Sequence, residues 1–171
     1  AERITRLPRN EWVFGVSNAS IVMASFLHAA PAGARFNAAE LGAWYAGTAL
    51  LTAVAEVGHH LRREAVSRRK REMRLQYRTY VARLEGEYVD VRGQAGTRPD
   101  LYSPDSYAAS QPFGEDIRAR GGAGIVYDSV RHVGGTCVVA YRPRNILDVT
   151  PGDQLEIAAP ARGRIVVRQL A

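Results

Sequence analysis

The sequence predicts a single domain of the α+β class with mixed or antiparallel sheets, in which strands outnumber helices. Seven segments have the composition of strands and two that of helices, and the two kinds do not alternate regularly along the chain. This order disfavours a doubly wound parallel sheet. The 171 residues, 46% of them hydrophobic, are enough for one domain with its own core. No repeat or linker divides residues 1–171.

The clearest helix is expected over residues 50–71. Apolar side chains recur there at helical spacing, namely Leu50, Val54, Val57 and Leu61. Thr48 stands before them in the position of an N-cap. The first half is apolar on nearly all sides, which predicts burial, whereas the second half carries charges on most faces and is expected to reach solvent.

The strand candidates lie on both sides of this helix. They are residues 43–46, 75–81, 87–91, 124–127, 136–141, 154–158 and 164–169, where apolar and β-branched residues concentrate. A second helix is expected over residues 113–120, closed by Gly121 and Gly122. Gly134 and Gly135 stand between two strand candidates, as a two-residue hairpin turn would.

The charge of the chain is positive but does not identify a partner. Lys and Arg number 23 against 17 Asp and Glu, a net charge of +6, and only Lys70 is lysine. The Arg-rich stretch 62–78 could contact nucleic-acid phosphates without any enzymatic activity. It runs into a strand pattern and matches no nucleic-acid-binding module. We therefore expect no direct nucleic-acid contact, and a solvated face or a surface for an acidic partner instead.

Cysteine use and hydropathy favour a cytoplasmic protein. The single cysteine, Cys137, can form no intrachain disulfide, which favours a reducing compartment. No secretory signal pattern opens the sequence. The uncharged stretch 12–34 is interrupted by polar residues, and the apolar stretch 41–55 is too short to span a bilayer, so we expect no membrane contact.

Glu56 and Arg35 are the ionisable residues that point most directly to a site. Glu56 lies in the helix half that is expected to be buried, and buried carboxylates are costly unless they are paired and are frequent at functional sites. Arg35 follows Gly33 after a long uncharged stretch, and its planar fork suits a phosphate or a carboxylate. For each residue, a purely structural ion pair is an equally open interpretation.

Two other kinds of site are disfavoured. Glu56, His59 and His60 share a helix face, but no second half of a di-iron site and no zinc-protease motif accompanies them, so we predict no metal. Cys137 lies in the middle of a strand candidate, as a small core residue does. Ser129 lies at the end of a strand without the glycine elbow of a hydrolase nucleophile.

Five short blocks stand in a fixed order along residues 32–145. They are GARFN at 33–37, WYA at 44–46, TAVAE at 52–56, GIVYDSVR at 124–131 and GTCVVAYRP at 135–143. In this order they resemble the RES-domain family, which is named for its Arg, Glu and Ser. The resemblance implies a toxin of a bacterial toxin–antitoxin pair, with a fold like that of ADP-ribosyltransferases and an activity that consumes NAD.

The resemblance also implies the substrate, the partner and the site residues. Family members degrade NAD by attack of water or phosphate, or transfer its ADP-ribose to a protein. Their partner is an Xre-type antitoxin with a helix-turn-helix, which blocks the active site. The implied catalytic residues are Glu56, Arg35 and Tyr45. The implied NAD-binding residues are Arg35, Tyr45, Ser129, Asn37 and an early arginine, either Arg3 or Arg6.

The chemistry of NAD cleavage fits these residue types. Breaking the bond between ribose and nicotinamide creates positive charge on the sugar, which a carboxylate such as Glu56 stabilises. Arg35 would hold the pyrophosphate or a ribose hydroxyl, Tyr45 would pack against the nicotinamide end, and Ser129 would form a hydrogen bond there. No metal is needed, because nicotinamide leaves as a neutral amine.

Overall fold

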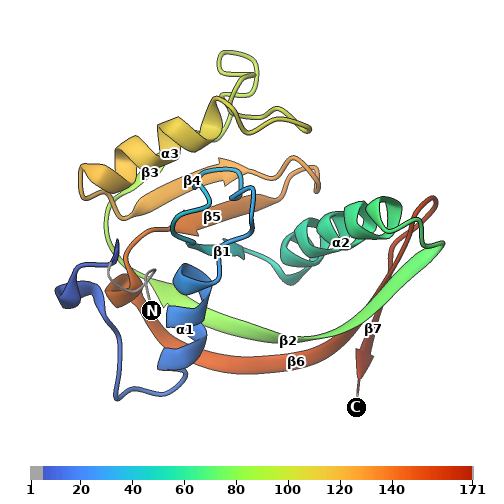
Figure 1. Cartoon of the computed structure of the whole chain (residues 1–171), viewed down its shortest axis with the longest axis horizontal. Coiled ribbons are helices and arrows are strands. Elements are labelled where there is room, and N and C mark those ends of the chain that lie inside the picture. Colours follow the sequence, from blue (N-terminus) through green and yellow to red (C-terminus); the bar gives the residue numbers. More distant parts are fainter. Residues whose placement is uncertain (1–5, 171) are drawn as a thin grey trace.

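Two sheets and three α-helices make up the computed structural model, which describes residues 6–170 (Figure 1). One sheet has four strands of mixed direction, and the other has three antiparallel strands. Two short 3₁₀ helices, Arg9–Glu11 and Pro143–Asn145, complete the described elements. The expected α+β class is confirmed.

The four-stranded sheet lies under α3 (Ser110–Ala119) and carries the larger core (Figure 1). Its strands, in spatial order, are β1 (Trp44–Gly47), β5 (Thr136–Ala140), β4 (Gly124–Asp128) and β3 (Tyr88–Asp90). Only the β3–β4 pair is parallel. Buried apolar side chains of this sheet pack with Phe36, Leu101 and Ile117 into one cluster.

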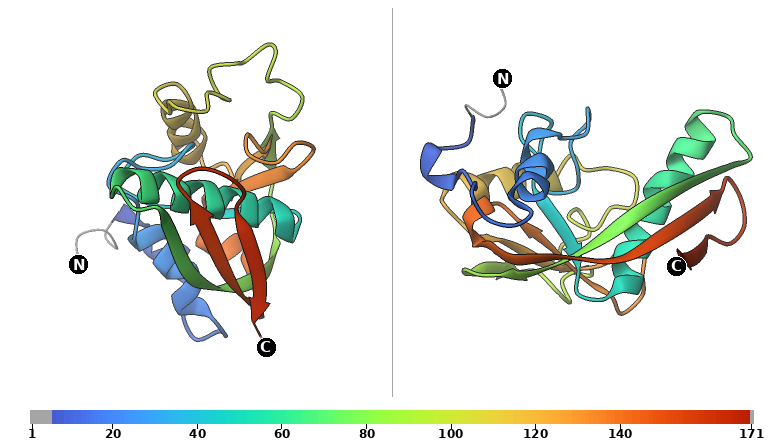
Figure 2. Two further views of the ribbon diagram at one scale, coloured as in Figure 1. Left: turned by 90° about the vertical axis from the view of Figure 1, so that its right-hand side faces the viewer. Right: turned by 90° about the horizontal axis from the view of Figure 1, so that it is seen from below.

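The three-stranded sheet is a long twisted ribbon that supports the other two helices (Figure 2). Its strands are β2 (Glu72–Leu84), β6 (Ile146–Pro160) and β7 (Val166–Leu170), with β6 in the middle. The helices are α1 (Ala19–Leu27) and α2 (Leu50–Ser67). Burial of Leu61 against Ile157 and Ala159 fixes α2 on this sheet.

The structure corrects three details of the helix expected over residues 50–71. The helix ends at Ser67, and Arg69 follows with a φ of +53°. The N-cap is Ala49 rather than Thr48, whose hydroxyl faces the carbonyl oxygen of Thr136 in β5. The first half is not buried all round, because α2 packs against strands of both sheets but neither sheet covers the side that carries Leu51, which is 68% exposed.

Other local expectations need correction in the second half of the chain. A seven-residue loop, residues 129–135, joins β4 to β5, so Gly134 and Gly135 are not a two-residue hairpin turn but the end of a turn that His132 opens. The strand expected over residues 154–158 begins eight residues earlier, at Ile146. Within residues 6–170, no helix has the length and apolar character needed to cross a membrane.

Candidate active site

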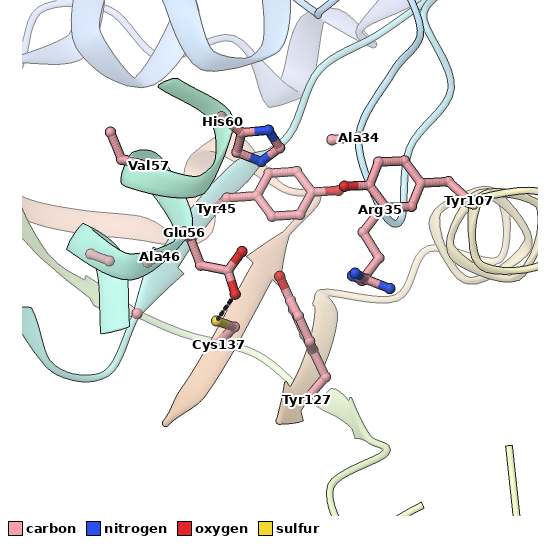
Figure 3. A pocket seen from close by; sticks show the side chains of 12 residues that line it. Ala34, Arg35, Tyr45, Ala46, Glu56, Val57, His60, Tyr107, Tyr127 and Cys137 are labelled. Atoms are coloured by element: carbon pink, nitrogen blue, oxygen red, sulfur yellow. Dashed lines mark hydrogen bonds between the residues drawn. The ribbon is translucent and has the colours of Figure 1, made fainter. Parts of the chain in front are cut away.

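A cavity of about 300 Å³ opens between α2, β1 and the loops around Arg35 and Tyr107 (Figure 3). The three residues expected to be catalytic line it, namely Arg35, Tyr45 and Glu56. The other lining residues are mostly small, apolar or aromatic: Ala34, Ala46, Gly47, Ala53, Val57, His60, Tyr107, Tyr127 and Cys137. The structure therefore brings together the three residues expected to be catalytic, which come from a loop, a strand and a helix.

Glu56 is held in this cavity through only one of its two carboxylate oxygens. Its Oε1 accepts a hydrogen bond of 2.6 Å from the Ser129 hydroxyl and a longer contact of 3.6 Å from the Cys137 thiol. Among residues 6–170, nothing donates a hydrogen bond to Oε2, and no Arg, Lys or His forms an ion pair with the carboxylate. The structural ion pair left open by the sequence is thus not formed.

Ser129 positions Glu56 through a network that fixes the direction of its hydroxyl proton. The Ser129 Oγ accepts hydrogen bonds from the backbone N–H groups of Arg131 (3.1 Å) and His132 (3.0 Å). Since both acceptor positions are used, the hydroxyl proton is directed at Glu56. The loop itself is tied to α2 by a contact of 2.9 Å between His132 Nδ1 and the buried Thr52 hydroxyl.

Tyr45 presents its ring to the cavity while its hydroxyl is fully engaged by the protein. The hydroxyl accepts a hydrogen bond from the Phe36 N–H and donates one of 2.8 Å to Asn37 Oδ1. The Asn37 amide nitrogen donates to the carbonyl oxygens of Ala38 and Leu41. Asn37 is 2% exposed and does not line the cavity, so it holds the Tyr45 ring in place. Its expected contact with NAD stays a prediction.

Arg35 joins the cavity to the loop that forms its far wall. The side chain is buried, and its Nη1 donates to the carbonyl oxygens of Leu101 (3.0 Å) and Ser103 (2.9 Å). Its guanidinium carbon lies 5.1 Å from the ring centre of Tyr107, within the range of a cation–π contact. Among the described residues, no carboxylate pairs with Arg35, so the guanidinium keeps its charge available to an anion in the cavity.

Tyr127 and Tyr107 line the cavity but were not singled out from the sequence. The Tyr127 hydroxyl points between Glu56 and Arg35 (Figure 3). A signal for Tyr127 existed, because it lies two residues before Ser129 in a strand, and alternate residues of a strand share a face. Burial raises the pKa of the Tyr45 and Tyr127 hydroxyls, so both rings stay neutral.

Cys137 is a core residue, as expected, and also part of the cavity floor. It is 2% exposed within β5, and its sulfur faces Glu56 (Figure 3). Burial, followed by the nearby Glu56 charge, raises the pKa of the thiol to about 12. The thiol therefore stays protonated at neutral pH, which makes it a poor nucleophile.

The early arginine of the resemblance is not assigned to the cavity. Arg3 lies outside the described residues, and Arg6 is exposed and does not line the cavity. His59 and His60 follow Glu56 on α2, and His60 reaches the cavity wall. Within residues 6–170, no three His, Cys, Asp or Glu side chains gather as metal ligands would.

The stability of the folded chain is expected to depend on pH through His59, a residue of α2. Burial, reinforced by the charges of Arg131 and His60, lowers the pKa of His59 to about 4, and no group among residues 6–170 forms a hydrogen bond with its Nε2. The unfolded chain takes up this proton near pH 6.5, whereas the folded chain takes it up only near pH 4. We therefore expect the free energy of unfolding to fall as the pH drops from about 6.5 to 4.

Urea unfolding at several pH values would measure this effect. In His59→Gln the decrease between pH 6.5 and 4 should be smaller than in the unsubstituted chain. Equal slopes in the two proteins would contradict the assignment to His59.

The comparisons with known proteins identify the family of the chain. The search of curated proteins gives no match. The model of the RES domain matches residues 3–159, which includes the Arg35 loop, Tyr45, Glu56 and Ser129. Since the match covers most of the sequence, the chain belongs to the RES domain family.

Proposed function

We propose that this chain cleaves NAD at the bond between nicotinamide and ribose, by hydrolysis or phosphorolysis, and acts as the toxin of a toxin–antitoxin pair. The observation that carries the proposal is the Glu56 carboxylate, which accepts hydrogen bonds through Oε1 and receives none at Oε2 from residues 6–170, in the cavity that the buried Arg35 also lines. The RES-domain match supports it, because the family resemblance implies this activity and a fold like that of ADP-ribosyltransferases.

The cavity supplies what this reaction needs in its transition state. When the bond from C1′ to nicotinamide breaks, its electron pair leaves with the nicotinamide nitrogen, and positive charge develops on the ribose. The Glu56 carboxylate offsets that charge, and the mainly apolar walls strengthen the interaction by excluding water. Water or phosphate then forms the new bond to C1′, and water loses a proton as it does so. Arg35 attracts the pyrophosphate, and the Tyr45 ring packs against the nicotinamide end.

Incubation of the purified chain with NAD, followed by identification of the products, tests the proposal. Parallel reactions would contain buffer alone, phosphate, or a cell lysate. Free ADP-ribose or its phosphorylated form, together with nicotinamide, is the expected result. A modified protein in the lysate would assign ADP-ribosyl transfer instead, with the same residues at the reacting bond. Unchanged NAD in all three reactions would contradict an NAD-consuming activity.

Arg35→Ala is expected to weaken NAD binding and to loosen the loop that Arg35 holds. The substitution removes a charge-assisted contact worth about 1.5–3 kcal/mol, so KM should rise by roughly ten- to a hundredfold. Arg35→Lys should restore only part of this, because an ammonium lacks the planar guanidinium, in which Nη1 alone donates to two carbonyl oxygens and the other nitrogens can bond an anion. Steady-state kinetics, with limited proteolysis of residues 101–107, would separate the two effects.

The control for this prediction is Arg98→Ala, which removes a half-buried arginine that pairs with Asp100 and lies over the Phe113 ring, outside the cavity. That variant should keep the KM of the unsubstituted chain. Full activity of Arg35→Lys would show that Arg35 contributes only its charge.

The proposed partner is an Xre-type helix-turn-helix antitoxin that covers the cavity. If it occupies the space beside Arg35 and Glu56, bound antitoxin and bound NAD exclude each other, and each weakens the other's affinity by the same factor. Calorimetric titration of the inactive Glu56→Gln chain with NAD, before and after saturation with antitoxin, measures this coupling. Undiminished NAD affinity in the complex would contradict occlusion of the cavity.

A further inference from the structure

The positive charge of the chain is concentrated at one end of the molecule. Residues 62–78 and 161–168 carry eleven Arg or Lys side chains and two carboxylates, a net charge of +9, whereas the remainder of the chain carries −3. These residues form the second half of α2, the first half of β2, the β6–β7 turn and most of β7. We call this surface the basic tip, and it lies at the right-hand end of Figure 1.

Hydrogen bonds join the separate segments of the basic tip into one surface. The Ala161 N–H donates to the carbonyl oxygen of Arg71, at 2.9 Å, just before β2 begins. The Arg62 side chain on α2 donates to the carbonyl oxygens of Pro160, the last residue of β6, and of Gly163 in the β6–β7 turn. The arginines of the three segments are therefore held beside one another.

Most charges of the basic tip have no carboxylate partner. The ion pairs present join Arg68 to Glu64, and Arg74 to Glu72 and Glu156. Among the described residues, no carboxylate pairs with the remaining exposed cations, which are Arg63, Arg69, Lys70, Arg71, Arg78, Arg162, Arg164 and Arg168. A concentration of like charge disfavours the compact state, and an anionic partner would relieve that repulsion.

The basic tip also offers exposed apolar side chains and an unpaired strand edge. Val66, Leu75, Val166 and Val167 are exposed there. β7 is the last strand of its sheet and, among the described elements, pairs only with β6 (Figure 2). The backbone groups along its outer edge can therefore pair with an added strand.

We propose that the basic tip binds an acidic, extended segment of a partner polypeptide, which adds to the edge of β7. Carboxylates of the segment would face Arg162, Arg164 and Arg168, and its apolar side chains would cover Val167, which lies on the opposite face of β7 from Arg168. A second copy of the chain is disfavoured, because two surfaces of charge +9 repel each other.

The side chains of the basic tip also favour a polypeptide over a nucleic acid. Single-stranded nucleic acids stack their bases on exposed aromatic rings. The one aromatic residue of residues 62–78 and 161–168, Tyr77, packs against the cluster around Leu61 instead. The exposed valines cannot form a hydrogen bond or an ion pair with a phosphate through their side chains. They can, however, pack against the apolar side chains of an extended peptide.

The test uses a labelled peptide of alternating Glu and Val, about ten residues long, which is the length of a long strand. Its binding to the full chain is followed by fluorescence anisotropy. We expect affinity to fall as salt rises. Reversal of three charges, in Arg162→Glu, Arg164→Glu and Arg168→Glu together, should weaken binding by about ten- to a hundredfold. The matched control reverses Arg9, Arg120 and Arg144, which are exposed arginines outside the basic tip.

A second arm tests strand addition without changing the protein. The same peptide, N-methylated at every residue, keeps its carboxylates but has no N–H group to donate to β7 along either edge, and it should bind at least about tenfold more weakly.

Three results would overturn the proposal. Equal loss of affinity in the control triple variant would show dependence on net charge alone, and equal affinity of the N-methylated peptide would exclude strand addition. Tighter binding of duplex DNA or RNA, lost in the same triple variant, would assign the tip to nucleic acid. None of these outcomes bears on NAD cleavage, which is measured separately.

Discussion

Glu56→Gln is expected to reduce the rate of NAD cleavage by roughly a hundredfold or more, while the protein still folds. Glutamine keeps the size of the side chain and an oxygen that can accept the Ser129 hydrogen bond, so the packing around α2 is preserved. What is lost is the negative charge that offsets the charge developing on the ribose. The effect should appear in kcat, since the charge acts mainly in the transition state.

The rate of nicotinamide release, measured beside the thermal unfolding curve, checks this expectation. Glu64→Gln is a matched control, because it makes the same change on the same helix at a carboxylate that pairs with Arg68 outside the cavity. Near-normal turnover in a folded Glu56→Gln protein would remove Glu56 from the chemistry. An equal loss in Glu64→Gln would show that the helix, rather than the carboxylate, is being disturbed.

The secondary structure was predictable from the sequence where a run of apolar residues is pronounced, because such a run becomes a buried strand. The strands around Tyr45, Ile125 and Val139 were recognised because short apolar runs in the sequence became buried strands. The first half of β6 was missed, since residues 146–153 include a proline, a glycine and two aspartates, which are rare in strands. Pairing with the long strand β2 overrides this weak local preference.

The α1 helix shows a second limit of the sequence. Residues 19–27 form α1 but lie in the uncharged stretch 12–34, for which the sequence predicts no helix. Since its apolar residues are not confined to one face, periodicity gives little signal there. Packing of Val22 and Phe26 against Trp44 is a long-range contact that no local pattern reveals.

The candidate site was predictable in its residues but not in their connections. Arg35, Tyr45 and Glu56 were expected to act together, and they line one cavity. The sequence could not show that Arg35 bonds the backbone near Leu101, because that contact joins residues 66 positions apart. Tyr107 could not be predicted either, because its loop has no recognisable sequence pattern and long-range contacts place it at the cavity.

Ser129→Ala is expected to lower kcat by about ten- to a hundredfold with little change in KM. The hydroxyl donates to Glu56 but does not line the cavity, so it acts through the carboxylate rather than on NAD. A hydrogen bond to a charged group contributes about 1.5–3 kcal/mol, which corresponds to this range of rates. The substitution also leaves the N–H groups of Arg131 and His132 without their acceptor, which frees the loop that carries Ser129. Ser129→Thr keeps the hydroxyl and should recover much of the activity.

A double-mutant cycle decides whether Ser129 works only through Glu56. In the Glu56→Gln background the Ser129→Ala change should cost little further activity, because the charge that the hydroxyl positions is already gone. Ser110→Ala is the matched control: it removes a fully buried hydroxyl that has no hydrogen-bond partner in the described part of the chain, and it should leave kcat unchanged. If instead the kcat of the double variant falls by the product of the two single-variant factors, Ser129 contributes independently of Glu56. A direct contact between Ser129 and the nicotinamide end of NAD then becomes the better explanation.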